Sequence, residues 1–148
     1  MIELRGLRRE GLGAAHKLLP LQLPRIRQEF PELTGIHLGT LNVTLDSGLI
    51  VAVPDYRTKP IRWHADTVEG EVFDLLRIRL EAPIGAPEVR AWFYIPHWSP
   101  HRADPHLHEI LAPKIEWPED QPCKIRIDRK DAFRYANWPL IIIGGPAA

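Results

Sequence analysis

Apolar and polar residues alternate with a period of two through the middle of the chain. Within Val72–Leu80, apolar and charged side chains alternate from Leu76 onward, as in a β-strand with one wet face. The stretch Glu88–Ile95 alternates too, with the side chains of Val89, Ala91, Phe93 and Ile95 on one face. Pro83, Gly85 and Pro87 lie in the link between them, a composition suited to a turn. The pattern predicts a β-hairpin.

Other short apolar stretches predict further strands. Each is bounded by glycine, proline, aspartate or serine, and many short strands of this kind are typical of a barrel. The sequence therefore predicts a mainly β fold, a small six-stranded barrel with one or two short helices. The further strands are expected at Ile2–Arg5, Leu41–Leu45, Ile50–Val53, Leu107–Leu111 and Lys124–Ile127.

One helix is expected between the first two strands. Pro24 suits a first helical turn, and Leu23, Ile26 and Phe30 can share one face. Gly35 can end a second turn after Pro31. The chain has 15 prolines, and proline interrupts helices and central strands. We therefore expect short elements and a helix that caps one opening of the barrel.

Composition indicates a single globular domain over residues 1–148. Of the 148 residues, 45% are hydrophobic and 26% charged, enough for one core. Lysine plus arginine and aspartate plus glutamate number 19 each, so no net field favours nucleic acid or an anionic membrane as a partner.

The cysteine and the apolar runs indicate a cytoplasmic protein. The single cysteine, Cys123, excludes an intramolecular disulfide, fits a reducing compartment, and is expected to be a half-buried strand residue. No run approaches the roughly 20 apolar residues of a membrane span, and no signal-peptide pattern appears. The most apolar stretch, Trp138–Ile143, is expected to form a buried strand.

Two glycine-marked segments carry the candidate chemistry. The first consists of Gly11, Leu12, Gly13, Ala14, Ala15, His16 and Lys17. Small residues there let the backbone approach a ligand, successive N–H groups can hold an anion, and Lys17 offers a counter-charge. An ordinary turn is the alternative, because glycine is common wherever a chain turns.

The second segment is Gly39–Leu45. In a strand, Thr40 and Asn42 share one face while Leu41 and Val43 point into the core. Mg²⁺ takes hard oxygen ligands and keeps water and phosphate in its other positions, so the Thr40 and Asn42 oxygens form a candidate Mg²⁺ site. A strand whose outer face merely carries these two residues remains the alternative.

These segments together resemble the archaeal CTP-dependent riboflavin kinases, a family of cradle-loop barrels. The resemblance rests on the Gly-x-Gly segment, one helix and then Gly39-Thr40-Leu41-Asn42 at the family's interval. A third match is the segment from His108 to Pro113, which is similar to the family's Glu-Ile-x-Ala-Pro sequence and is followed by a predicted strand. The matched region runs from Gly11 to Ile127.

The resemblance implies a reaction and a set of roles. The γ-phosphoryl group of CTP passes to riboflavin, giving CDP and FMN, with Mg²⁺ held by Thr40 and Asn42. Glu109 contacts the flavin side and orients or deprotonates the acceptor hydroxyl, unless it is an ordinary strand carboxylate. Ser99 and His101 lie near the sequence position at which the family has a flavin-contacting hydroxyl. The nucleotide-binding residues comprise the 11–17 segment and Lys114, Ile115, Glu116 and Trp117.

Departures from the family pattern leave other classes open. Ala15 replaces a glycine of the family loop, and the proline-broken segment 115–120 leaves the nucleotide base undecided. A non-catalytic flavin or nucleotide binder is one alternative. A metal-dependent enzyme is another, because four histidines lie between His97 and His108, and His106 and His108 have the spacing of Zn²⁺ ligands on a strand.

Overall fold

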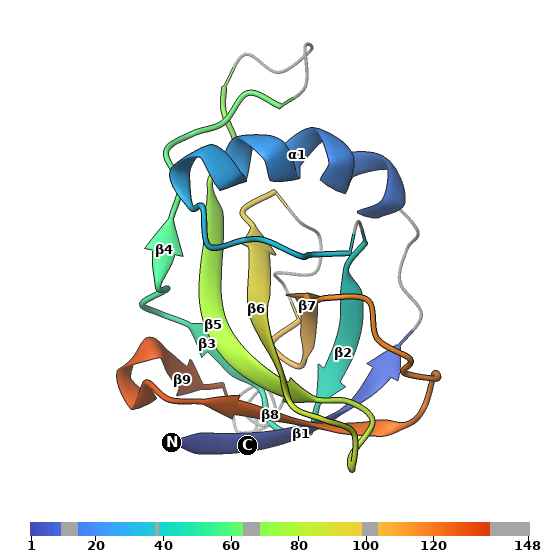
Figure 1. Ribbon diagram of the computed structural model, residues 1–148. Helices are drawn as coiled ribbons and strands as arrows, with labels where there is room; N and C mark the ends of the chain where they lie inside the picture. The colour runs from blue at the N-terminus through green and yellow to red at the C-terminus, as the bar shows by residue number, and fades with distance from the viewer. Residues whose placement is uncertain (10–14, 38, 64–68, 99–103, 137–148) are drawn as a thin grey trace.

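The computed structural model describes residues 1–9, 15–37, 39–63, 69–98 and 104–136, without the side chains of residues 15–18. Its strands are short, and one α-helix lies among the described residues (Figure 1). The elements are β1 (Ile2–Arg9), α1 (Ala15–Glu29), β2 (Leu41–Leu45), β3 (Leu49–Val51), β4 (Tyr56–Arg57), β5 (Phe73–Glu81), β6 (Val89–Pro96), β7 (Leu107–Leu111), β8 (Pro122–Ile127), the 3₁₀ turn η2 (Lys130–Ala132) and β9 (Phe133–Tyr135).

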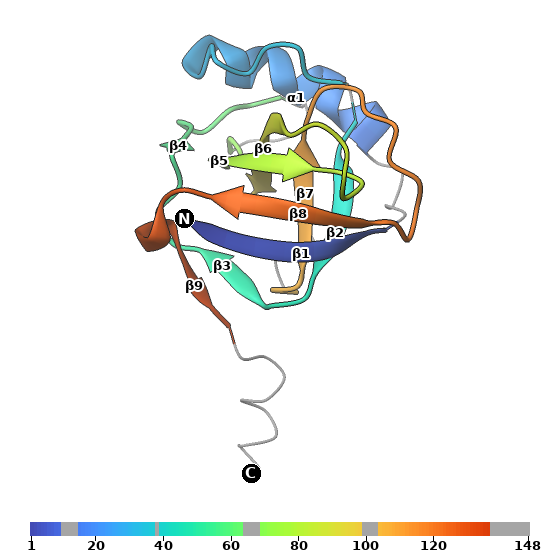
Figure 2. The ribbon, with the colours of Figure 1, turned by 60° about the horizontal axis from the view of Figure 1, so that its bottom comes forward.

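The strands close into an antiparallel barrel. Hydrogen bonding follows the order β4-β5-β6-β7-β2-β1-β8, and an additional β5–β8 pairing joins the ends. Strand is the main secondary structure of the described residues, and six of the strands form the closed barrel. Figure 2 shows β1 and β8 running side by side along the lower wall. The predicted mainly β, six-stranded barrel is therefore confirmed.

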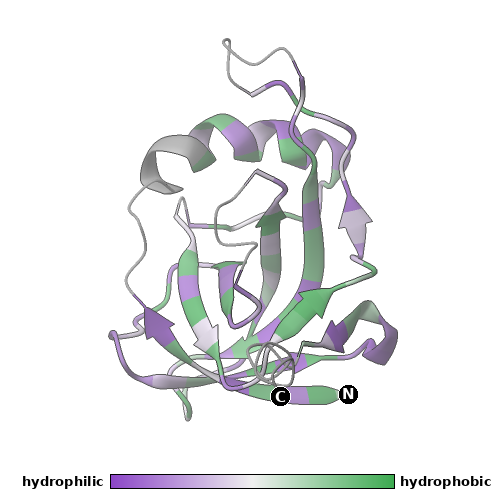
Figure 3. Cartoon of the chain, turned by 180° about the vertical axis from the view of Figure 1, so that it is seen from behind, coloured by the Kyte–Doolittle hydropathy of each residue, from purple (hydrophilic) through white to green (hydrophobic). Residues whose placement is uncertain are grey.

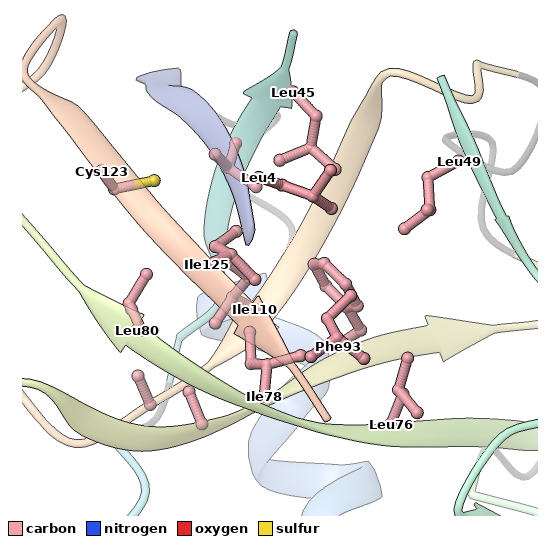
Figure 4. Packing of buried hydrophobic residues seen from close by; sticks show 14 of the residues in the cluster. Leu4, Leu45, Leu49, Leu76, Ile78, Leu80, Phe93, Ile110, Cys123 and Ile125 are labelled. Carbon is pink, nitrogen blue, oxygen red and sulfur yellow. The ribbon is translucent and has the colours of Figure 1, made fainter. Parts of the chain in front are cut away.

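The period-two pattern decides which side chains fill the barrel. Apolar residues alternate with polar ones along the strands (Figure 3), and the apolar set points inward. Leu4 of β1, Val43 and Leu45 of β2, and Phe93 of β6 are all at most 4% exposed and pack in one cluster. Figure 4 shows Phe93, Ile110 and Ile125 among the side chains of this interior.

The predicted hairpin is confirmed. Strands β5 and β6 pair antiparallel from Phe73 opposite Pro96 to Leu80 opposite Val89. The strands predicted at Leu41–Leu45 and Leu107–Leu111 have the expected bounds, and the other three are shifted or longer. The sequence did not predict β4 and β9, which have only two and three residues and show no periodicity. Cys123 is fully buried rather than half-buried.

A second apolar layer lies outside the barrel, beneath α1. Leu19, Leu23 and Ile26 of the helix are at most 1% exposed. They pack against the outer face of β5–β7, including Trp92, Tyr94 and Leu111. The face of β6 that carries Trp92 and Tyr94 is therefore buried, because α1 covers it (Figure 1).

The predicted start of the helix is wrong. The helix begins at Ala15, so that Pro20 and Pro24 both lie inside it. Each proline removes one intrahelical hydrogen bond, but both side chains are on the exposed face, where water can satisfy the freed carbonyls. Burial of the opposite face, at about 1.5–3 kcal/mol for each large apolar side chain, offsets that cost.

The predicted strand Trp138–Ile143 lies outside the described residues. Within the described part of the chain, no helix has both the length and the apolar character needed to cross a membrane.

Replacing Phe93 by alanine tests the interior packing. Phe93 is fully buried in the barrel, so Phe93→Ala should lower the free energy of unfolding by about 3–5 kcal/mol. Val53→Ala, at a 48% exposed position, should change it by less than about 0.5 kcal/mol. Urea unfolding followed by circular dichroism measures both. Equal effects at the two positions contradict the packing described.

Candidate functional site

A row of polar side chains crosses the outer face of the barrel. Arg9 of β1 is the Cα partner of Asn42 in β2, Asn42 that of Glu109 in β7, and Glu109 that of Tyr94 in β6. Because Val43 and Leu45 point into the barrel, Asn42 points to the opposite face. Pairing between distant segments thus brings polar side chains of four strands into one row.

Thr40, Asn42 and Glu109 meet in this row. The Thr40 hydroxyl donates a hydrogen bond of 3.1 Å to Oε1 of Glu109, across 69 residues of sequence. Asn42 is 8% exposed, and its Oδ1 atom is buried without a hydrogen-bond partner. An unsatisfied buried oxygen costs roughly 1–3 kcal/mol and is uncommon in folded proteins. The amide oxygen is therefore a buried acceptor without a partner, on the strand that pairs with β7 at Glu109.

Those atoms fit the coordination chemistry of Mg²⁺. Hydroxyl, amide and carboxylate oxygens are hard ligands, and the unpartnered Asn42 oxygen is the kind of atom that a cation can satisfy. The structure therefore brings the two predicted Mg²⁺ ligands, Thr40 and Asn42, together with the predicted catalytic carboxylate, Glu109.

The described residues on either side of the predicted phosphate segment lie near this row. Residues 11–14 lie outside the described part of the chain, whereas Ala15, His16 and Lys17 form the first turn of α1. The N-terminal end of α1 lies above the start of β2 (Figures 1 and 2). At the other side, β1 ends at Arg9, opposite Asn42. The chain therefore enters and leaves the segment close to the Thr40–Asn42 pair.

The second predicted nucleotide segment, Lys114–Trp117, divides into two parts. Lys114 and Glu116 are exposed, whereas Ile115 and Trp117 pack against the barrel core. The Trp117 indole is 2% exposed and donates a 2.8 Å hydrogen bond to the Gln121 carbonyl. A ligand can therefore reach the side chains of Lys114 and Glu116 but not the Trp117 ring.

Arg8 connects that segment to β1. Its guanidinium donates a hydrogen bond to the Trp117 carbonyl, and the Arg8 carbonyl accepts one of 3.4 Å from the Asp120 amide. The structure therefore brings Trp117 and Asp120 to the end of β1 at which the 11–14 segment begins.

Tyr94 joins the polar row to the helix. Its hydroxyl donates to Oε1 of Gln22 in α1, and both side chains are at most 5% exposed. Burial raises the pKa of Tyr94 well above its usual value, and the negative charges of Glu109 and Glu71 add to the effect. Tyr94 is therefore a neutral donor at physiological pH, and its bond to Gln22 is a polar contact within the apolar layer beneath α1.

A pocket of about 180 Å³ opens beside Glu109. Its wall is about half polar and half apolar, because leucine, isoleucine, valine and proline residues line it together with several charged groups. The lining residues are Leu49, Ile50, Val51, Arg57, Asp74, Tyr94, Ile95, Pro96, Asp104, Pro105, Leu107, His108 and Glu109.

Asp74 is the most deeply buried charge of this pocket. Burial alone raises its pKa, but hydrogen bonds from Arg57, at 2.7 and 2.9 Å, and from His97, at 2.9 Å, outweigh burial and lower it. Asp74 is therefore ionised and held between two neighbours. His108 lies in the same wall, 5.0 Å from the Phe93 ring centroid, and burial lowers its pKa, which favours the neutral imidazole.

The histidines do not gather into a metal site within the described residues. His106 contacts the Leu45 carbonyl at 3.0 Å, and His108 the Pro105 carbonyl at 2.9 Å. No group of three histidine, cysteine, aspartate or glutamate side chains placed to hold a metal occurs in the part of the chain that the structure describes. The predicted flavin-side residues Ser99 and His101 lie outside it.

Sequence reasoning missed Arg9, Tyr94 and Gln22. A signal existed for Tyr94, which alternates with the core residue Phe93 and so had to lie on the outer face with Trp92. No local pattern indicates that β1 pairs with β2 so that Arg9 stands opposite Asn42, because register depends on the closed sheet.

Comparison with protein-family models and with curated proteins finds no match to the chain.

Replacing Tyr94 by phenylalanine tests its bond to the helix. The change leaves Gln22 buried without its donor, so Tyr94→Phe should lower the free energy of unfolding by about 1–3 kcal/mol at pH 8. Because the folded-state pKa of Tyr94 is raised, the stability that Tyr94 contributes is complete below pH 10 and declines as pH rises above that value.

The variant should therefore lose less stability than the wild type between about pH 10 and 11. Urea unfolding across this range measures the slope, and Tyr135→Phe, at a 55% exposed position, is the control. An unchanged slope in Tyr94→Phe, or an equal change in both variants, counts against the assignment.

Proposed function

We propose that the chain is a Mg²⁺-dependent phosphotransferase that moves the γ-phosphoryl group of CTP to riboflavin. The observation that carries this proposal is the buried, unpartnered Oδ1 of Asn42, next to Thr40 and Glu109. The same residues are the motif positions of the resemblance to riboflavin kinases. The activity, the acceptor and the identity of the nucleotide base are all part of the proposal.

Thr40 and Asn42 are the proposed Mg²⁺ ligands. Both are neutral, so an empty site carries no repulsion between ligands, and binding of the ion depends on the phosphates that accompany it. When bound, Mg²⁺ supplies neutralisation of the charge on the transferring phosphate oxygens. Burial of Asn42 fixes its position before the nucleotide arrives, which reduces the cost of ordering the site.

Glu109 is the proposed general base. The hydrogen bond from Thr40 holds one carboxylate oxygen, while Tyr94, its cross-strand partner, is occupied with Gln22. In the reaction, an acceptor hydroxyl oxygen forms a bond to the γ-phosphorus as the bond to the β,γ-bridging oxygen breaks. Glu109 takes the hydroxyl proton, and CDP leaves with the electron pair of the broken bond.

The first turn of α1 is proposed to bind the donor phosphates. Helix N-termini present unpaired N–H groups and a partial positive charge, which suits an anion. The turn begins at Ala15, directly after the Gly11–Ala14 segment. The acceptor is proposed to lie in the pocket that Glu109 lines together with apolar and charged residues.

Replacing Asn42 tests the site without destabilising the fold. Asn42→Ala removes a buried oxygen that has no partner, so stability should stay unchanged or rise by up to about 3 kcal/mol. The affinity for CTP in the presence of Mg²⁺ should fall roughly 10- to 100-fold, and FMN formation should fall with it. Isothermal titration calorimetry and a chromatographic FMN assay measure the two.

Asp46→Ala is the matched control, since Asp46 is exposed just after the end of β2. It should leave binding and turnover unchanged. A panel of nucleoside triphosphates, each tested with riboflavin, identifies the nucleotide base that the enzyme uses. If none of the triphosphates is consumed, the kinase proposal is contradicted. Nucleotide binding without product identifies the non-catalytic binder instead.

Replacing Glu109 by glutamine separates chemistry from binding. Glutamine keeps the size and can accept the Thr40 hydrogen bond but is not a base, so kcat should fall roughly 10²- to 10⁴-fold. The KM for CTP should change little. Glu3→Gln, on β1 at a 42% exposed side chain, is the control. A kcat within about threefold of the wild type rules out the assigned role for Glu109.

A further inference from the structure

A positively charged side chain, that of Arg9, extends the polar row beyond Asn42. Arg9 is the Cα partner of Asn42, one strand further from Glu109. Its Nε atom donates a 3.3 Å hydrogen bond to the hydroxyl of Thr44, which follows Asn42 on the same outer face of β2. The side chain is therefore directed over β2 toward Thr44, next to Asn42 on the same face.

The other contact of Arg9 is weak. Its Nη1 atom is 3.7 Å from Oδ1 of Asp120, with the two side chains 49% and 72% exposed. Charge-assisted hydrogen bonds are about 2.7–2.9 Å long, and exposed pairs contribute at most about 1 kcal/mol. By contrast, Arg8 points the other way and donates to the Trp117 carbonyl. Arg9 is thus held in place, and among the described residues its carboxylate contact is the long one to Asp120.

Binding of a triphosphate at this row requires a positively charged side chain in addition to Mg²⁺. Thr40, Asn42 and Tyr94 are neutral, and Glu109 adds a negative charge. A divalent cation offsets only part of the charge of a triphosphate, and phosphoryl transfer requires further neutralisation. Along the cross-strand row from Arg9 through Asn42 and Glu109 to Tyr94, Arg9 is the positive residue.

We propose that Arg9 is a phosphate-binding residue that selects triphosphates, with its guanidinium on the donor's phosphate oxygens. This inference rests on the proposed function. Arginine suits the role because its planar fork matches phosphate geometry with two parallel hydrogen bonds. On binding, Arg9 exchanges the distant Asp120 carboxylate for the phosphate oxygens.

A structural role predicts a different result. If Arg9 only ties the segment around Asp120 to β1, then loss of either partner has the same effect. Asp120→Asn distinguishes the two roles. Asparagine tolerates the positive φ of 63° at this position, and it removes the competing charge. Under the proposal, Asp120→Asn leaves CTP affinity unchanged or increases it.

The test is calorimetric binding of CTP, CDP and cytidine with Mg²⁺ to the full chain. Arg9→Ala should weaken CTP binding about tenfold or more, the effect of one charge-assisted hydrogen bond. CDP should lose less, and cytidine should be unaffected. Arg5→Ala is the matched control, because Arg5 lies on the same face of the same strand, opposite Lys124 rather than Asn42. Circular dichroism checks that each variant is folded.

Salt provides a second readout. The difference in CTP affinity between the wild type and Arg9→Ala should shrink as ionic strength rises, because exposed charges are screened. Equal CTP binding by Arg9→Ala and wild type overturns the inference while leaving the proposed function intact. An equal loss in Asp120→Asn, or a loss that extends to cytidine, also overturns it. Absence of nucleotide binding by the wild type overturns both proposals together.

Discussion

The site depends on the direction in which β2 faces. Val43 and Leu45 are locked into the barrel interior, and this forces Asn42 onto the outer face. Because side chains alternate strictly along a strand, a shift of one residue would move Asn42 into the apolar interior and expose Val43. The cost of that exchange fixes the register with β1 and β7. The packing of the core thereby positions the polar row.

The second constraint is the cover that α1 provides. The outer faces of β5, β6 and β7 would otherwise expose Leu75, Trp92 and Leu111 to water. The helix buries them, and the bond between Tyr94 and Gln22 adds a directional contact to this apolar surface. Apolar packing alone is non-directional, so the polar pair restricts sliding of the helix. The position of the helix is tied in this way to β6, the strand that pairs with β7 at Glu109.

Sequence reasoning succeeded where local periodicity reports burial. The β5–β6 hairpin and the strand Leu41–Leu45 follow from alternation. The start of α1 did not follow, because helix propensity penalises Pro20 whereas burial of Leu19 and Leu23 in the tertiary structure favours the longer helix. Thr40 and Asn42 were predicted from their shared strand face and oxygen chemistry, and Glu109 from motif resemblance. Their meeting through the 3.1 Å bond between Thr40 and Glu109 is a property of the closed sheet that no local pattern contains.

The central claim is that Asn42 lies within the coordination sphere of a nucleotide-bound divalent cation. Paramagnetic Mn²⁺ in place of Mg²⁺ tests it directly by nuclear magnetic resonance. With CTP present, Mn²⁺ should broaden the side-chain amide signal of Asn42 and the backbone signals of Thr40 and Glu109 most strongly, while Val51 in β3 stays sharp. Sharp Asn42 signals, or broadening centred on another part of the barrel, would contradict the account.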